Sequence, residues 1–321
     1  MLRHAALIAA LAACSEPATP PPGDAWTLGT PLPEARLEPG VTSIGQRLIV
    51  LGGFDATLAI TRDIDAYDAL TDEWHSIQDA PVAWTHPNVA AVATTLYLLG
   101  GLEGTSFIPR GDSFALDLET PTAAWRPLAP MPPGYERGAA AVVVSPPHVF
   151  LLGGATMTGA VATNLDYNLS TDTWSLLPEL PSPRSHAAAM RMADGTLIVA
   201  GGLASLEATS ALDEVWALPV GATEWQPRAP MPTARGGCAY GELFGQLVCA
   251  GGERDSEALA VVESYNPLSD EWMVLEPMPF PRAGTQGAVI GGRLFVPGGS
   301  GSLRFEPTDT VLVFSFLEAL K

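Results

Sequence analysis

One internal repeat constrains the fold of this chain more than any other feature. The doublet Gly-Gly occurs six times at a step of 47 to 53 residues, and a tryptophan keeps the same period. The doublets begin at Gly52, Gly100, Gly153, Gly201, Gly251 and Gly298. The tryptophans, each followed seven residues later by a proline, are Trp26, Trp74, Trp125, Trp174, Trp225 and Trp272. One such unit cannot bury its own apolar faces and needs neighbouring copies. We therefore expect one closed domain of repeats, although 321 residues alone would suggest about two domains.

Each repeat is predicted to form four antiparallel β-strands. Two apolar runs precede each doublet, and short turns join them. The fourth repeat has Asp194-Gly195 there, which favours a two-residue hairpin because both positions prefer a positive φ, whereas the third has Pro146-Pro147 and must turn differently. The third strand ends at an apolar residue seven before the tryptophan, and the fourth strand carries the tryptophan and stops at the proline. Four antiparallel strands in each repeat are the structure of a propeller blade.

This pattern resembles the Kelch-repeat family from about residue 26 to the end of the chain. The Gly-Gly doublet, the Tyr or Leu seven residues before the tryptophan, and an arginine after the proline of the preceding repeat carry the resemblance. It implies an all-β fold, a six-bladed Kelch β-propeller over residues 24–321. The sixth repeat has a strand at 311–316 and no tryptophan after it, while Trp26-Thr27-Leu28 is a fourth strand with no strands before it. We therefore expect the N-terminal strand to complete the sixth blade as its outer strand and to close the ring.

Residues 1–23 differ in character from the repeats. A short basic start precedes nine apolar residues, Ala5 to Ala13, which are too few to span a bilayer and fit a secretory signal. Leu11-Ala12-Ala13-Cys14 resembles the lipobox of bacterial lipoproteins. The resemblance implies a signal peptide over residues 1–13, a lipidated Cys14, and a proline-rich tether over residues 14–23. Ser15 after the cysteine favours the outer membrane, with the propeller periplasmic or exposed at the cell surface. An ordinary signal peptide is the alternative.

The charge of the chain limits its partners. The net charge is −19, which disfavours nucleic acid and peripheral docking on anionic lipid, because both require basic surfaces. Contact with a membrane is expected only through the lipid anchor. The expected partner is a protein or a glycan, and the chain is expected to be a monomer.

Five arginines recur where each repeat enters its innermost strand, and they are the candidate ligand-binding residues. They are Arg36, Arg137, Arg184, Arg235 and Arg282, with Trp84 at this position in the second repeat. Arginine suits bidentate binding of carboxylate or phosphate, so the arginines would place cations around one mouth of the channel and favour an acidic partner. In Kelch proteins that use this face, the equivalent arginines often bind acidic partners. The alternative is structural: each arginine pairs with a carboxylate or carbonyl of a neighbouring loop.

Other reactive residues give weaker patterns. The acids that follow the doublets lack the spacing of a calcium loop. Cys238 and Cys249 are diagonal neighbours on paired strands and are predicted to be buried thiols rather than a disulfide. His86 and His186 follow the arginine position of their repeats, but no two histidines have the spacing of metal ligands, so we expect neither a metal nor a cofactor.

The leading functional hypothesis is a non-enzymatic, envelope-tethered propeller that binds a protein or glycan. The alternative is a sugar epimerase or mutarotase that acts on an acidic sugar such as N-acetylneuraminate, since a periplasmic enzyme of that kind is similar in fold and compartment. Glu136 beside Arg137, and then Glu34 near Arg36, would be its acid–base candidates, although no motif here matches that enzyme's catalytic residues. A copper oxidase of the galactose-oxidase type would need a Tyr/His copper site, for which no cluster is seen. A purely structural envelope protein is the third hypothesis.

Overall fold

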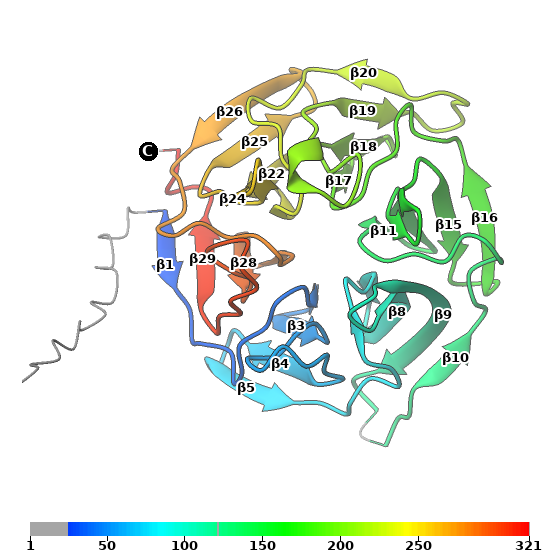
Figure 1. The fold of residues 1–321 in the computed structure, drawn as a ribbon, viewed down its shortest axis with the longest axis vertical. Coiled ribbons are helices and arrows are strands. Elements are labelled where there is room, and N and C mark those ends of the chain that lie inside the picture. The colour runs from blue at the N-terminus through cyan, green and yellow to red at the C-terminus, as the bar shows by residue number, and fades with distance from the viewer. Residues whose placement is uncertain (1–24, 121, 321) are drawn as a thin grey trace, which may run out of the picture.

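The computed structural model describes residues 25–120 and 122–320, so the predicted signal peptide, the lipidation site Cys14 and the whole predicted tether lie outside the described residues. Six antiparallel sheets stand as blades around a central channel, which confirms the predicted propeller (Figure 1). The first blade consists of β2 (Gly40–Ile44), β3 (Arg47–Leu51), β4 (Ile64–Asp68) and β5 (Glu73–Ser76). The second consists of β7 (Val89–Val92), β8 (Thr95–Glu103), β9 (Ile108–Asp117) and β10 (Arg126–Leu128), and β6 (Trp84–Thr85) also pairs with β8. The third consists of β11 (Ala141–Ser145), β12 (His148–Leu152), β15 (Asn164–Asn168) and β16 (Thr173–Leu177). The fourth blade consists of β17 (Ala188–Arg191), β18 (Leu197–Ala200), β19 (Val215–Leu218) and β20 (Gln226–Arg228). The fifth consists of β21 (Ala239–Leu243), β22 (Gln246–Ala250), β25 (Val262–Asn266) and β26 (Glu271–Leu275). The sixth consists of β27 (Ala288–Ile290), β28 (Arg293–Pro297), β29 (Val311–Ser315) and β1 (Trp26–Leu28).

The sixth blade joins the two ends of the described chain, as predicted. Strand β1 pairs antiparallel with β29, with Trp26 opposite Phe314. Both side chains are fully buried, and their ring centroids lie 4.8 Å apart. This pairing covers the edge that β29 would otherwise expose, which is how a propeller avoids a free strand edge.

The hydrophobic core lies between neighbouring blades. One cluster packs Leu48 and Val50 of the first blade against Ile290, Phe295 and Val313 of the sixth. The central strands β3, β12, β18 and β22 are almost wholly buried, since both of their faces meet a neighbouring blade. No helix in the described ranges is long and apolar enough to cross a membrane.

The Gly-Gly doublets let adjacent blades approach closely. The first glycine of every doublet has a φ between 61° and 74°, which suits glycine and few other residues. A Cβ atom at that position would also lie within 2.9 Å of a carbonyl oxygen in the next blade, the oxygen belonging to Trp84 or to one of the recurring arginines. The repeat therefore keeps glycine where the arginine segment of the next blade crosses it.

The inner hairpins agree with the predicted turns except in the fourth blade. Gly291-Gly292 and Phe244-Gly245 form two-residue turns in which both residues have positive φ. Pro146-Pro147 also forms a two-residue connection, with a cis peptide bond between the prolines. The predicted two-residue turn at Asp194-Gly195 was wrong: the amide of Met192 donates to Thr196, and only Gly195 has a positive φ. The loop thus has three residues, and the Asp194 carboxylate accepts the Thr196 amide at 2.9 Å.

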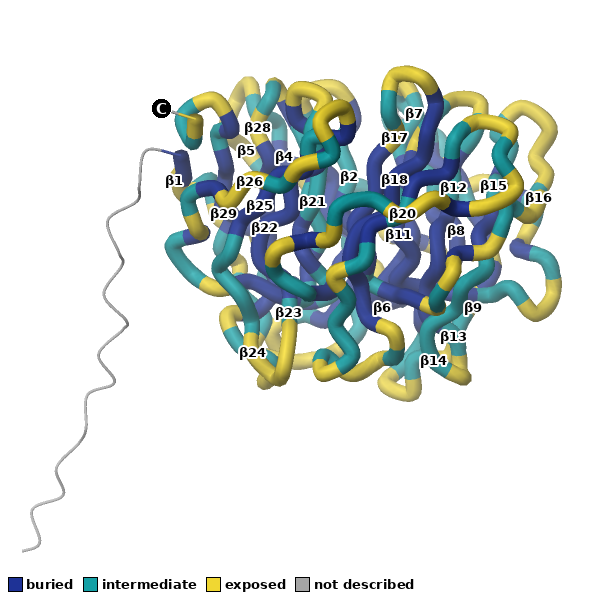
Figure 2. The backbone as a smooth tube through the Cα atoms, turned by 90° about the horizontal axis from the view of Figure 1, so that it is seen from above, coloured by how far each residue is buried: buried dark blue, intermediate teal, exposed yellow. Residues whose placement is uncertain are grey.

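Two faces of the ring differ in character. The segments that follow the doublets project from one face and include two small hairpins, β13 (Ala155–Thr156) with β14 (Gly159–Ala160) and β23 (Glu253–Arg254) with β24 (Glu257–Ala258) (Figure 2). We call this the loop face. A short 3₁₀ helix, η1 (Ala208–Ser210), belongs to the same set of loops. The tight turns of the inner hairpins lie on the opposite face.

Candidate functional site

Six equivalent residues surround the channel at the loop face, one from each blade. Each stands two positions after the recurring arginine, or after Trp84 in the second blade, and each has a φ between 50° and 66°. They are Glu38, His86, Ala139, His186, Gly237 and Gly284. The amides of the first five donate to the carbonyl of the equivalent residue in the preceding blade, at 2.7 to 3.0 Å. This hydrogen-bonded circle holds non-glycine residues in a left-handed backbone that is otherwise costly.

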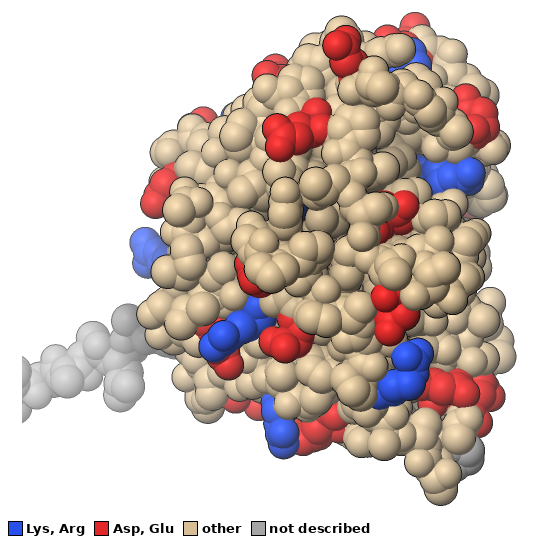
Figure 3. Space-filling model, turned by 90° about the vertical axis from the view of Figure 1, so that its right-hand side faces the viewer, with Lys and Arg blue, Asp and Glu red and all other residues tan. Residues whose placement is uncertain are grey.

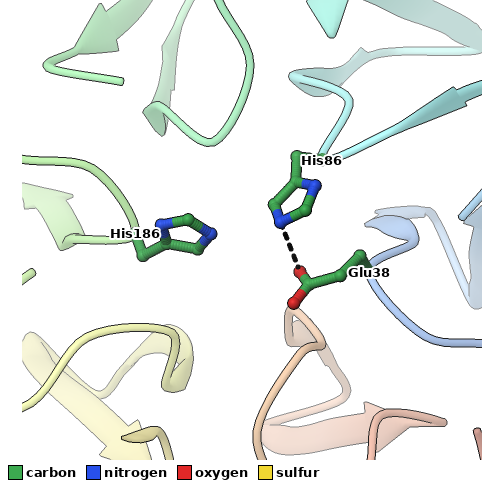
Figure 4. A group of neighbouring side chains, drawn as sticks. All are labelled: Glu38, His86 and His186. Carbon is green, nitrogen blue, oxygen red and sulfur yellow. Dashed lines mark ion pairs between the residues drawn. The ribbon is translucent and has the colours of Figure 1, made fainter. Parts of the chain in front are cut away.

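Three of these six residues carry side chains that can bind a proton or a metal. Glu38, His86 and His186 each offer one ligand atom, and the three atoms lie within 4.8 Å of one another. Nε2 of His86 lies 3.2 Å from a carboxylate oxygen of Glu38, and the two imidazoles meet edge to face with their centroids 5.1 Å apart. Figure 4 shows the three side chains converging from three different blades. The other three positions hold only alanine and glycine, which leaves the centre of the circle to these side chains.

The surroundings of each histidine select its free nitrogen. Nδ1 of His86 lies 3.0 Å from the hydroxyl of Thr85, and Nδ1 of His186 lies 2.9 Å from the hydroxyl of Ser185. Nε2 is therefore the nitrogen available at the centre. Burial lowers the pKa of each imidazole to about 4, so both are neutral at neutral pH. Burial also raises the pKa of Glu38.

A cavity of about 710 Å³ opens above these three side chains on the loop face. The carboxyl groups of its wall belong to Glu38, Glu207, Glu253 and Glu257, and Arg304 also lines it. Burial, with a smaller contribution from the charge of Glu38, raises the pKa of Glu253 to about 7. The apolar part of the wall consists of Leu102, Phe107, Leu206, Ala208, Ala258, Leu303 and Phe305. The cavity thus combines carboxyl groups, of which Glu207 and Glu257 are exposed, with apolar side chains.

The five predicted arginines are not exposed at this mouth. Arg36, Arg137, Arg184, Arg235 and Arg282 are between 0% and 5% exposed. Arg36 bonds to Glu34, Asp63 and Asp65. The guanidinium groups of Arg137, Arg184 and Arg235 also bond within their own blades.

Carboxylates and carbonyls of the blades bind these groups. Arg184 pairs with Glu214 at 2.7 Å and Arg235 with the fully buried Glu263 at 2.6 Å. Arg137 donates to carbonyls of Gly153 and Thr163. Arg282 is held most weakly of the five, by a hydrogen bond of 3.4 Å to the Pro281 carbonyl. Burial lowers the pKa of Arg282 to about 10. These contacts match the structural alternative, while ligand binding by the arginines stays a prediction.

The contact between the two histidines was not predicted. His86 and His186 follow the arginine position of their repeats, which favours the same mouth of the channel, but they lack the sequence spacing of metal ligands, and the structure brings their imidazoles into edge-to-face contact. The prediction of two thiols rather than a disulfide is confirmed: Cys238 and Cys249 are buried and not bridged, and Cys249 faces Tyr240.

The acid–base candidates of the sugar-epimerase hypothesis have local structural contacts. Glu34 pairs with Arg36, and Glu136 accepts the amide of Gly134 at 2.9 Å.

Charged side chains are mixed on one outer side of the ring (Figure 3). On the side shown in Figure 3, acidic and basic side chains are scattered among uncharged ones, and no continuous basic patch is visible. This distribution agrees with the overall negative charge. The convergent side chains and the cavity therefore make the loop face the candidate functional site.

Known proteins similar to this chain are Kelch proteins. Residues 86–299 match the family described as the KLHDC2/KLHL20/DRC7 Kelch-repeats domain, and residues 35–81 match the Kelch motif. Kelch-like protein terF of Aspergillus terreus is 32% identical over 283 residues, covering 82% of this chain and 61% of that protein. The human influenza virus NS1A-binding protein is 41% identical over 75 residues, covering 23% of this chain and 12% of that protein. Human Kelch-like protein 33 is 30% identical over 132 residues, covering 41% and 25%.

The chain spans about three fifths of the length of terF, and less of the other two relatives. None of these matches supports the sugar-epimerase alternative. The repeat, the six closed blades and the family matches agree: the chain belongs to the Kelch-repeat family of β-propellers.

Proposed function

We propose that this chain is a protein-binding module that receives a basic segment of its partner in the loop-face cavity. The observation that supports this proposal best is the lining of the cavity, in which four glutamates and several apolar side chains surround a volume of about 710 Å³. A lysine or arginine side chain would place its apolar stem against Leu206 or Phe305 and its charge near the carboxylates. The net charge of −19 would also speed the approach of a basic partner.

The position of the arginines supports a basic partner over the acidic one expected from the sequence. Their guanidinium groups are buried and bonded within the blades, so they offer little to an incoming carboxylate. The family adds support for a protein partner, because one relative is, by its name, a binding protein for the influenza NS1A protein. If the partner is a glycan, the chain should bind to a glycan array and select no peptide.

Selection of displayed peptides tests this proposal. A random peptide library on phage would be selected against the full-length chain, with a parallel selection against Glu207→Gln/Glu257→Gln. Both glutamates are exposed, so the double variant should fold normally. We expect enrichment of peptides with Lys or Arg beside an apolar residue, and loss of that enrichment with the variant. Enrichment of acidic peptides would refute the proposal. Binding of the chain to an immobilised glycan array, with no peptide selected, would refute it as well.

The proposed module is attached to a membrane through Cys14. Support comes from the sequence alone: the apolar run Ala5 to Ala13 and the lipobox-like Leu11-Ala12-Ala13-Cys14. In this arrangement the propeller is held at a bacterial outer membrane, on its periplasmic or external side. The test is fractionation of cells that express the wild type or Cys14→Ser. The wild type should stay with membranes in high salt and the variant should be soluble, because lipid chains insert by apolar burial rather than by charge. Equal distribution of the two proteins would contradict the anchor.

A further inference from the structure

We propose that Glu38, His86 and His186 form a binding site for one divalent transition-metal ion of the zinc class, at the floor of the loop-face cavity. The site is independent of the proposed partner binding. It arises because three blades place their equivalent residues around the narrow inner end of the ring. Three features support the site: the geometry of the three donors, the groups that hydrogen-bond to the histidines and the cavity that the donors line.

The donors already lie close to a metal-binding arrangement. Their ligand atoms fall within 4.8 Å of one another, and His86 Nε2 lies 3.2 Å from Glu38 Oε2. Zn²⁺ bonds of about 2.0–2.2 Å in a tetrahedron place ligand atoms about 3.4 Å apart. Binding would therefore need one donor to move by about 1.4 Å, which rotation of a side chain provides, while the Glu38–His86 edge already fits.

The hydroxyl behind His86 fixes the tautomer that a metal requires. Thr85 Oγ1 donates to the carbonyl of Leu102 at 3.4 Å, so its lone pair accepts the Nδ1 proton of His86 at 3.0 Å. The lone pair of Nε2 then faces a carboxylate oxygen of Glu38. Two acceptors at 3.2 Å repel each other unless a proton or a cation lies between them. A hydrogen bond from the second ring nitrogen to a fixed partner is also the usual support of a metal-bound histidine.

The donor set selects the class of metal. Two imidazole nitrogens and one carboxylate oxygen suit Zn²⁺ and other first-row transition ions, whereas Ca²⁺ and Mg²⁺ prefer oxygen ligands throughout. Three protein ligands leave one position of a tetrahedral ion open. Because the same three side chains line the cavity of about 710 Å³, that position would face the cavity and could accept water or a side chain of a ligand.

The circle of left-handed residues allows a clean test of the donors. Ala139 occupies the same position in the third blade with a φ of 51°, so an alanine at 86 or 186 adopts a backbone that the fold already tolerates. Loss of metal binding in such variants would then report the missing imidazole and not a collapsed ring. His75 and His148, which are 62% and 37% exposed, provide a matched control at two histidines elsewhere.

Calorimetric titration of the chelator-treated, full-length chain with Zn²⁺ tests the site. We expect one equivalent to bind in the wild type and in His75→Ala/His148→Ala, and that equivalent to be lost in His86→Ala/His186→Ala. Thr85→Val should weaken binding by about 10- to 100-fold, and Thr85→Ser should restore it. Mg²⁺ at the same concentration should not compete. Stoichiometric binding that survives in His86→Ala/His186→Ala, or no stoichiometric binding in the folded wild type, would overturn the proposal.

Discussion

The indole Nε1 of Trp26 donates a hydrogen bond of 3.1 Å to the carbonyl oxygen of Glu276, which ties the N-terminal strand to the fifth blade. The other five repeating tryptophans, which lie in the outer strand or directly before it, make the equivalent bond to the neighbouring segment of the ring at 2.9 to 3.0 Å. Trp26 therefore completes a series that runs around the whole propeller. Trp26 lies in β1, whereas the other three strands of the blade that it completes, β27 to β29, are the last three strands of the described chain.

Loss of this side chain should destabilise the whole ring. Trp26→Ala removes a fully buried indole and its hydrogen bond, so we expect the free energy of unfolding to fall by about 3–5 kcal/mol. Leu28→Ala on the same strand is the control, since Leu28 is 60% exposed and its loss should change stability by less than about 0.5 kcal/mol. Urea denaturation of both variants makes the comparison. Equal stability of the two would mean that β1 does not close the ring.

The buried ion pair of Arg235 and Glu263 gives a second prediction. Both side chains are 0% exposed, so Arg235→Met leaves an unpaired buried carboxylate and should cost about 3–5 kcal/mol of stability. Arg235→Met/Glu263→Leu removes both charges and should recover most of that loss. Arg62→Met, which removes a half-exposed partner of Asp79, should cost about 0–1 kcal/mol. A stable Arg235→Met variant that loses only peptide binding would instead give this arginine the ligand-binding role expected from the sequence.

Much of the architecture could be predicted from the sequence, because it repeats. The six doublets and tryptophans define the blades, and the incomplete repeats at the two ends predict the pairing of β1 with β29. The turn at Asp194-Gly195 was wrong because the dipeptide is compatible with either a two-residue or a three-residue loop. Only the register of Met192 with Thr196 distinguishes them.

The candidate site could not be predicted by looking for motifs along the chain. His86 and His186 lie two blades apart, and their contact depends on how narrow the inner circle is, which spacing along the sequence does not give. A signal was nevertheless present. Glu38, His86 and His186 occupy the same position in their repeats, two residues after the arginine position. In a closed ring, equivalent positions at one end of the inner strands must converge.

The sequence could not show that the arginines are buried, because their burial depends on which acids pair with them. Arg36, Arg184 and Arg235 pair with acids that come from the third strand or its approach in the same blade. From sequence alone these carboxylates could equally have been exposed on the loop rim. Only the packed structure shows that Asp65 and Glu263 are buried behind the arginines.

The carboxyl group of Glu253 predicts a pH effect on stability. Its pKa is raised to about 7 in the folded chain, mainly by burial, so the folded state keeps a proton that the unfolded state releases near pH 4.5. Its contribution to stability is therefore present below that pH and is lost as the pH rises through about 7. With a chelator present, the wild type should gain roughly 2–3 kcal/mol over Glu253→Gln between pH 8 and pH 5. A constant difference between the two proteins across this range would show that the carboxyl group is not buried as described.

The two buried thiols should resist modification in the folded protein. Cys238 and Cys249 are buried and form no disulfide, so a reagent in solution has no access to either sulfur atom in the folded protein. In a Cys14→Ser background we expect no thiol to react with Ellman's reagent under native conditions and two to react in guanidinium chloride. Rapid native labelling, or fewer than two thiols after denaturation without reductant, would contradict this arrangement.

The affinity of a selected basic peptide for three proteins decides whether the loop-face cavity binds the partner. Fluorescence anisotropy would compare the wild type, the cavity variant Glu207→Gln/Glu257→Gln and the outer-strand control Glu73→Gln/Glu271→Gln, which removes the same charge from exposed positions. If the loop-face cavity is the binding site, the cavity variant should bind at least about tenfold more weakly, a loss of about 1.4 kcal/mol, and the control should match the wild type. Equal weakening in both variants would mean that only net charge attracts the peptide. Unchanged affinity in the cavity variant would place the binding site elsewhere on the propeller.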